Sequence, residues 1–165
     1  MVNGFKLPKD TVDNRIIVAV HAYTPYFFAL EPYSNVVEKF DDSKVEEVDL
    51  LFYDLKKKFI NKGTPVIISE TGCLKRSNNH DERIKWINYY WGGASSIADL
   101  AICINDNNVF ETWGTGLGQL NRKTLKWDDP EFIQTIMKYV DGTPAKVGGV
   151  VVKPSTEEPT KEPTK

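Results

Sequence analysis

The chain has 165 residues, of which 41% are hydrophobic and 12% are aromatic, and its 21 basic and 23 acidic residues give a net charge of -2. This composition can bury a core, so we expect one globular domain and exclude a wholly disordered chain. The charges are interspersed without a basic block, which argues against nucleic acid as a partner. No window approaches the ~18 apolar residues of a membrane helix, and the first residues lack the features of a signal peptide, so no membrane association is expected.

Three apolar runs indicate β-strands, and each leads into polar residues. They are residues 16–20 before His21, residues 65–69 before Glu70, and residues 100–104 before Asn105. Such apolar runs fit parallel strands that are covered on both faces, and the spacing leaves room for a crossover helix each time. The sequence therefore predicts an α/β fold of repeated strand-helix units. Ligands bind beyond the carboxyl ends of such strands, where Glu70 would stand.

A helix is predicted after Ser43, because residues 43–46 form a capping box and Gly63 provides a stop. Its apolar face would consist of Val48, Leu51, Phe52, Leu55 and Phe59.

Two further helices are predicted downstream. One begins near Asp81 and is weakened or ended by the glycine pair at 92–93. The other has Asp129 as its N-cap, Pro130 at its first position and Gly142 as its stop. Their apolar faces would be Ile84, Ile87 and Trp91 for the first, and Phe132, Ile133, Ile136, Met137 and Val140 for the second.

The remaining segments are predicted to be loops and a linker. Residues 24–42 are rich in aromatic side chains without a helical period, and residues 107–125 form a long glycine-containing loop. From residue 143 the composition changes to a proline, threonine, lysine and glutamate theme, which favours an extended spacer. We therefore expect a domain over residues 1–142 and a disordered linker over residues 143–165 that leads to another module.

Cysteine and histidine are too few and too scattered for a metal site. Cys73 and Cys103 lack metal-ligand spacing, and His21 and His80 are the only histidines, so no zinc site is expected. Both thiols are expected to be free and buried.

The order of three motifs resembles glycoside hydrolase family 5, the cellulase family, and in particular its endoglucanase and xyloglucanase branch from cellulosome-producing microbes. The motifs are the segments 21–30, 65–72 and 117–122. The similarity runs from about Phe5 to about Val140. It implies a (β/α)8 barrel, of which this chain would be the C-terminal portion, strands six to eight with their helices, since a full barrel needs about 250 residues. The linker resembles those that join such catalytic modules to a dockerin or a carbohydrate-binding module.

The resemblance also assigns roles to residues. Retaining glycosidases use two carboxylates about 5 Å apart, one as nucleophile and one as acid/base. Glu70 matches the nucleophile, Tyr23 the tyrosine that donates a hydrogen bond to it, and His21 the histidine that contacts the acid/base and the sugar. The alternatives are a glutamate that pairs with Lys75 or Arg76, a core histidine and a packing tyrosine. The acid/base itself is not found among these residues.

Substrate-binding residues are expected in the segments around Glu70. Asn105 and Asp106 stand where the family carries a Trp-Trp-Asp-Asn run, so the tryptophan platform for the sugar is missing. Asp106 could equally be structural. Further candidate subsite walls are Tyr26, Trp113, Phe28 and Tyr33.

Two functions remain open. The first is a fragment of a secreted, extracellular retaining endo-β-1,4-glucanase that acts on cellulose or a related β-glucan without a metal or organic cofactor. The second is a degenerate half-barrel that no longer hydrolyses but holds glucan or spaces the modules of a larger assembly. Loss of the tryptophan pair favours the second, and the set Glu70, His21 and Tyr23 favours the first.

Overall fold

The computed structural model describes residues 4–9, 11–32, 35–107 and 116–140, together with the backbone of residues 146–147 and 150–151. Three parallel strands, β1 (Val18–His21), β2 (Val66–Thr71) and β3 (Leu100–Ile104), form a sheet in the order β1-β2-β3. Helix α2 (Asp42–Lys58) connects the first two strands and α3 (His80–Ser95) the next two. The predicted strand-helix repeat is therefore confirmed.

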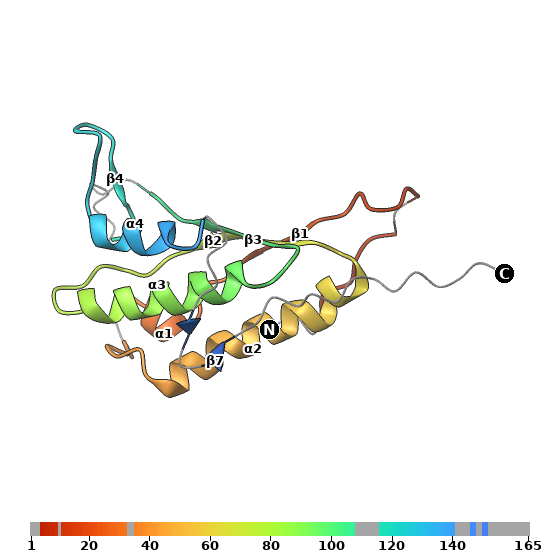
Figure 1. Ribbon diagram of the computed structural model, residues 1–165, viewed down its shortest axis with the longest axis horizontal. Coiled ribbons are helices and arrows are strands. Elements are labelled where there is room, and N and C mark those ends of the chain that lie inside the picture. Colours follow the sequence, from red (N-terminus) through yellow and green to blue (C-terminus); the bar gives the residue numbers. More distant parts are fainter. Residues whose placement is uncertain are drawn as a thin grey trace.

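The helices α2 and α3 lie on the same side of the sheet (Figure 1), and α4 (Pro130–Met137) packs beside α3. Residues that point toward these helices are buried, as Val18, Val66 and Leu100 show. The residues that alternate with them, such as Ala19 and Ala101, are exposed. One face of the sheet is thus core and the other is open to solvent, although apolar strands covered on both faces were predicted.

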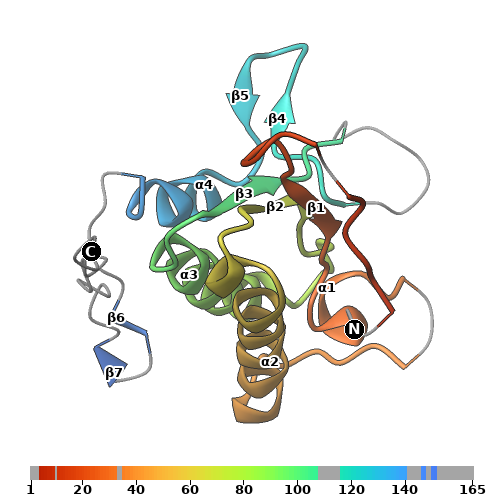
Figure 2. The same ribbon diagram turned by 90° about the vertical axis from the view of Figure 1, so that its right-hand side faces the viewer.

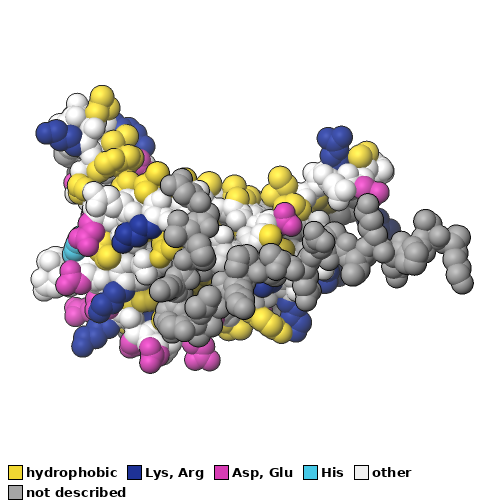
Figure 3. All heavy atoms as spheres, viewed as in Figure 1, with side chains coloured by type: hydrophobic (Ala, Val, Ile, Leu, Met, Phe, Trp, Pro, Cys, Tyr) yellow, Lys and Arg dark blue, Asp and Glu magenta, His cyan; other side chains and the backbone are white. Residues whose placement is uncertain are grey.

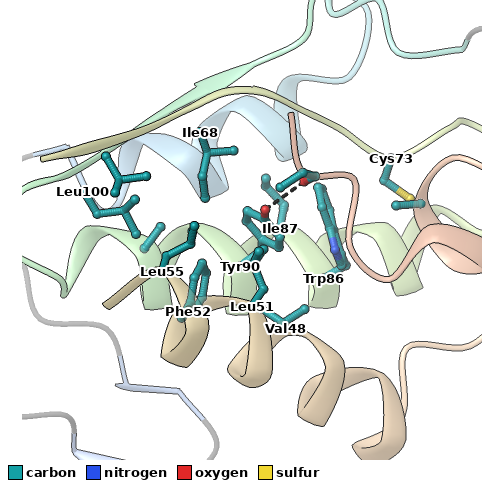
Figure 4. Close-up of a cluster of buried hydrophobic side chains, with 14 of the residues drawn as sticks. Val48, Leu51, Phe52, Leu55, Ile68, Cys73, Trp86, Ile87, Tyr90 and Leu100 are labelled. Atoms are coloured by element: carbon teal, nitrogen blue, oxygen red, sulfur yellow. Dashed lines mark hydrogen bonds between the residues drawn. The ribbon is translucent and has the colours of Figure 1, made fainter. Parts of the chain in front are cut away.

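The core lies between the sheet and the helices, and Figure 4 shows its centre. The predicted apolar face of α2 is confirmed, since Val48, Leu51, Phe52, Leu55 and Phe59 are all buried. The N-cap of α2 was predicted wrongly. Asp41, and not Ser43, caps the helix by accepting from the backbone amide of Ser43. Asp41 stands two residues earlier and places a carboxylate at the positive end of the helix.

Helix α3 begins at His80 and continues through the glycine pair to Ser95. A Cβ atom on Gly93 would lie 2.7 Å from the Phe52 ring, so the glycine permits close packing with α2 and does not end the helix. The side chains that α3 buries were partly mispredicted. Ile87 is buried as expected, but Arg83, Trp86, Tyr90 and Ala94 are buried rather than Ile84 and Trp91, which are half-buried.

The remaining differences concern loops and the end of α4. Residues 24–42 contain the short helix α1 (Tyr26–Ala29). The described part of residues 107–125 contains β4 (Leu120–Asn121), which pairs with β5 (Lys126–Trp127) in a hairpin that projects from the body in Figure 2. Asp129 caps α4 as predicted, but the helix ends at Met137. Met137 and Val140 are exposed, so their predicted place on its apolar face is wrong.

Two other sequence predictions concern the burial of the cysteines and the boundary between the domain and the linker. Cys73 is buried, but Cys103 is exposed because it points to the open face of the sheet, so its predicted burial is wrong. The expected stop at Gly142 lies outside the described residues, as does most of the expected linker. Within the linker the backbone of Lys146–Val147 (β6) pairs antiparallel with that of Val150–Val151 (β7). The domain boundary at residue 142 stays a prediction.

Candidate active site

The carboxyl ends of the three strands bring together His21, Tyr23, Glu70 and Asn105. His21 is the last residue of β1 and its Cα atom is in register with that of Glu70 near the end of β2. Asn105 follows β3, and its backbone amide donates to the carbonyl oxygen of Thr71 at 2.6 Å. Three segments that are distant in sequence thus present polar side chains at one edge of the sheet.

A bulge in β2 determines where Glu70 points. Ile68 pairs with Val20 and with Ile102, yet the next partners are Glu70 with His21 and Thr71 with Ile104. β2 therefore contains one residue more than its neighbours between these pairs. Strict alternation would place Glu70 on the buried face with Val66 and Ile68, whereas a bulge re-aims a side chain. Glu70 accordingly lies beside His21, while Thr71 is buried.

Two side chains contact the same carboxylate oxygen of Glu70. The Tyr23 hydroxyl donates to Glu70 Oε2 at 3.0 Å, and His21 Nδ1 lies 3.4 Å from that oxygen. The His21 side chain is 62% exposed and that of Glu70 is 42% exposed, so both are accessible to a ligand. The interpretation of His21 as a core histidine is therefore wrong.

The alternative partners of Glu70 are engaged elsewhere. Lys75 pairs with Asp128 and donates to the carbonyl oxygen of Gly118. Arg76 donates to the carbonyl oxygens of Phe28 and Glu31 at 2.8 and 2.7 Å. Glu70 is therefore not the ion-pair partner of either cation.

Helix α3 holds the segment that carries His21 and Tyr23. Ala22 and Thr24 alternate with these residues and are buried. The Tyr90 hydroxyl donates to the Ala22 carbonyl oxygen at 2.8 Å. The Trp86 indole donates to the Thr24 carbonyl oxygen at 2.9 Å.

Trp86 and Tyr90 are one helical turn apart, and their rings lie 5.1 Å from each other (Figure 4). The sequence interpretation missed this pair. The signal was present in the spacing of residues 83, 87, 90 and 94, which describes the buried face of α3.

The buried ion pair of Arg83 and Asp129 holds the loop after Glu70 against helices α3 and α4. Arg83 Nη1 donates to Asp129 Oδ2 at 2.8 Å, and Arg83 Nε donates to the Cys73 carbonyl oxygen at 3.1 Å. Asp129 Oδ1 also accepts from the backbone amide of Phe132 at the start of α4. The loop after β2, helix α3 and helix α4 are therefore joined through one guanidinium group.

Burial is the largest influence on the Tyr23 phenol and raises its pKa above the ordinary value. The hydrogen bond from Asn105 lowers that pKa, and the nearby Glu70 raises it. Tyr23 is therefore a protonated donor at neutral pH. Burial likewise raises the pKa of the Cys73 thiol to about 12, so this thiol is unreactive.

The predicted substrate-binding residues divide by their contacts. The Asn105 amide nitrogen lies 2.5 Å from the Tyr23 hydroxyl oxygen, so Asn105 belongs to the cluster around Glu70. Asp106 accepts from the backbone amides of Gln119 and Leu120 and pairs with Arg122 at 2.9 Å. These contacts tie the β4–β5 hairpin to the end of β3, and a substrate-binding role for Asp106 stays a prediction.

The aromatic candidates lie in different environments. Tyr26, at the start of α1, is half exposed and packs edge-on against Phe27. Phe28 is fully buried against Phe40, so its predicted role as a subsite wall is wrong. Trp113 and Tyr33 lie outside the described residues.

Residues 4–9, 11–32, 35–107 and 116–140 contain no group of three or more histidine, cysteine, aspartate or glutamate side chains that could hold a metal ion. No helix within these ranges is long and apolar enough to cross a membrane.

Known proteins match this chain in sequence. The model of the cellulase family, glycosyl hydrolase family 5, matches residues 1–108. Endoglucanase B of Neocallimastix patriciarum is 38% identical over 137 residues, which are 83% of this chain and 28% of that protein. Endoglucanase 1 of Ruminococcus albus is 34% identical over 146 residues, which are 87% of this chain and 34% of that protein. The chain thus spans about a third or less of the length of these relatives.

Solved structures match as well. A family 5 lichenase from Caldicellulosiruptor sp. F32, with a mutant solved in complex with cellotetraose, is 39% identical with a TM-score of 0.75. A broad-specificity endoglucanase from Ruminococcus champanellensis with bound cellotriose is 38% identical with a TM-score of 0.72. Each match covers 82% of this chain and 38% of the solved one.

These neighbours imply the (β/α)8 barrel architecture, of which this chain covers a part. The family match agrees with the three parallel strands and with the carboxylate at their carboxyl ends. The chain belongs to the cellulase family, glycosyl hydrolase family 5.

Proposed function

We propose that this chain is the C-terminal portion, strands six to eight, of a retaining family 5 endo-β-1,4-glucanase with Glu70 as its nucleophile. The observation that carries the proposal is the placement of Glu70 by the β2 bulge beside Tyr23 and His21. The names of the relatives, endoglucanases and a lichenase, support a β-glucan substrate.

The geometry suits the first step of retention. The other carboxylate oxygen of Glu70, Oε1, attacks the anomeric carbon, the glycosidic C–O bond breaks, and the leaving oxygen takes a proton from an acid on another part of the barrel. Tyr23 donates to Glu70 Oε2 and so orients the carboxylate. In the second step water loses a proton to the same acid/base group and its oxygen displaces Glu70 from the anomeric carbon.

The surroundings of the enzyme are part of the proposal. A polymeric glucan cannot enter a cell, so the parent protein is extracellular. The composition of residues 143–165 supports a spacer that leads to a dockerin or a carbohydrate-binding module. His21, exposed beside Glu70, contacts the acid/base and the sugar, while Tyr26 and Trp113 contribute to subsites.

The test is a barrel completed by fusing the first five strand-helix units of a related family 5 endoglucanase to this chain. Glu70→Gln should lower turnover of soluble β-glucan by at least about 100-fold, while Glu46→Gln, on the exposed face of α2, should not. Proton NMR of the first product should show the β anomer. Turnover that survives Glu70→Gln would contradict the proposal.

A second function is favoured by one observation, the presence of Ile104 and Asn105 in place of a tryptophan pair. A half-barrel without the platform would bind glucan without cleaving it. Calorimetry of the completed barrel with cellotetraose distinguishes the two functions. Binding without release of reducing sugar, unchanged by Glu70→Gln, would favour the binding role.

A further inference from the structure

The side chains of Asn105, Tyr23 and Glu70 form a chain of hydrogen bonds across the three strands. Asn105 Nδ2 lies 2.5 Å from the Tyr23 hydroxyl oxygen, which in turn lies 3.0 Å from Glu70 Oε2. Each residue comes from the end of a different strand, since Tyr23 follows β1, Glu70 is in β2 and Asn105 follows β3. The three are linked although Asn105 and Tyr23 are 82 residues apart.

The direction of these bonds follows from the donors available. An amide NH2 group only donates, whereas a phenol has one proton to donate and lone pairs that accept. If the Tyr23 oxygen accepts from Asn105, its own proton is committed to Glu70. If the Asn105 amide were turned, its carbonyl oxygen would compete with Glu70 for that proton.

The position of Asn105 is fixed by its backbone. Its amide nitrogen donates to the Thr71 carbonyl oxygen at 2.6 Å, and Thr71 itself is buried and donates through its hydroxyl to Ala22. The strand ends that carry Tyr23, Glu70 and Asn105 are therefore joined by hydrogen bonds through Thr71. A short side chain at residue 105 reaches Tyr23 only because this backbone is held in place.

We propose that Asn105 is a positioning residue for Glu70 and acts through Tyr23 by directing the phenol proton to the carboxylate. The catalytic consequence rests on the proposed function, whereas the hydrogen-bond chain itself does not. A donor to the phenol oxygen also strengthens the bond that the phenol donates, because hydrogen bonds in a chain polarise one another. Asn105 therefore supplies a hydrogen-bond donor to Tyr23 at the position where the resemblance places a tryptophan.

The first test measures Tyr23 in the 165-residue chain by 13C NMR of labelled tyrosine Cζ atoms, with Tyr23→Phe to assign its signal. Asn105→Leu should raise the pKa of Tyr23, because the bond from Asn105 lowers it in the native chain. Asn105→Asp should raise it further, because a second carboxylate opposes the phenolate. Asn88→Leu is the matched control, since Asn88 contacts the hydroxyl of a different tyrosine, Tyr139. A Tyr23 titration unchanged by Asn105→Leu would overturn the proposal.

The second test measures kcat and KM in the completed barrel. Asn105→Leu and Asn105→Trp should lower kcat about tenfold with little change in KM, because the hydrogen bond that commits the Tyr23 proton to Glu70 is lost. Asn105→Gln, which keeps the amide donor, should retain more activity than either. A gain in kcat/KM on Asn105→Trp would overturn the positioning role, because the side chain would then be a mere replacement for a platform. Activity that survives Glu70→Gln would refute the proposed function while leaving the Tyr23 titration as an independent result.

Discussion

The hydroxyl of Tyr90 donates a 2.8 Å hydrogen bond to the carbonyl oxygen of Ala22, the residue between His21 and Tyr23. Tyr90 is fully buried, and burial raises the pKa of its phenol above the ordinary value, so the hydroxyl is a protonated donor at neutral pH. The same carbonyl oxygen accepts from the Thr71 hydroxyl at 2.8 Å. Helix α3 and strand β2 therefore hold the backbone at Ala22 and so position His21 and Tyr23 on either side of it.

Tyr90→Phe should lower the free energy of unfolding by about 1 kcal/mol, the contribution of one buried hydrogen bond whose acceptor keeps a second donor. Urea denaturation followed by tryptophan fluorescence measures the change. Tyr89→Phe is the matched control, because its hydroxyl bonds to Asp49 at an exposed site and its loss should change stability by less than about 0.5 kcal/mol. Equal effects of the two variants would contradict this account.

Gly93→Ala should destabilise the chain despite the gain in helix propensity. Alanine is better than glycine in a helix by about 1 kcal/mol, but overpacking a core costs about 1 to 3 kcal/mol. A Cβ atom at residue 93 would lie 2.7 Å from Cε2 of the buried Phe52 ring. In the Phe52→Leu background the same change should become neutral or stabilising. A double-mutant cycle by urea denaturation measures this coupling, and additive effects would refute it.

Asp129→Asn should cost about 3 kcal/mol, because it leaves the buried Arg83 guanidinium without a counter-charge. Asp128→Asn, next in sequence and paired with Lys75 at a more exposed site, should cost less than about 1 kcal/mol. Thermal unfolding of both variants measures the difference. Similar losses in the two variants would show that burial does not distinguish these ion pairs.

The stability of the chain should also depend on pH through Asp129. Burial would raise the pKa of its carboxyl group, but the amide of Phe132 and the charge of Arg83 outweigh burial and hold the pKa below its ordinary value. A carboxyl whose folded pKa is depressed stabilises the fold above its unfolded pKa, and this stability is lost as pH falls through the folded value. Unfolding midpoints measured between pH 6 and about pH 2 should show this loss, and Asp129→Asn should reduce it. An equal acid sensitivity in the variant would contradict the assignment.

The open face of the sheet should cause association of the isolated chain. Ile17 is 66% exposed. Together with Ile67 and Ala101 it lines a shallow depression of about 370 Å3. Hydrophobic atoms line the upper margin of Figure 3, where Figure 1 places the strands. Uncovered apolar surface and open strand edges favour self-association.

Sedimentation velocity of the 165-residue chain should therefore show species larger than a monomer. Ile17→Lys should shift the distribution toward monomer, whereas Leu50→Lys, at a similarly exposed position on α2, should not. A monodisperse wild-type monomer would show that the open face does not drive association.

The sequence by itself determined the three parallel strands, the helices α2, α3 and α4, and the family, whereas α1 and the β4–β5 hairpin lie in segments predicted as loops. The apolar runs before His21, Glu70 and Asn105 became parallel strands, and the spacing of Val48, Leu51, Leu55 and Phe59 became the buried face of α2. These features are local, since alternation and helical period are properties of neighbouring residues. The motif order likewise identified the cellulase family from sequence alone.

Only the tertiary structure decided how the side chains meet. A strand pattern of strict alternation points Glu70 into the core, and the bulge that turns it toward His21 exists only in the pairing of β2 with its two neighbours. The sequence pattern marks Asn105 only as the place of a missing platform, whereas its bond to Tyr23 spans 82 residues and depends on the register of three strands. Contacts of this kind are set by register and packing, which no local pattern of residues contains.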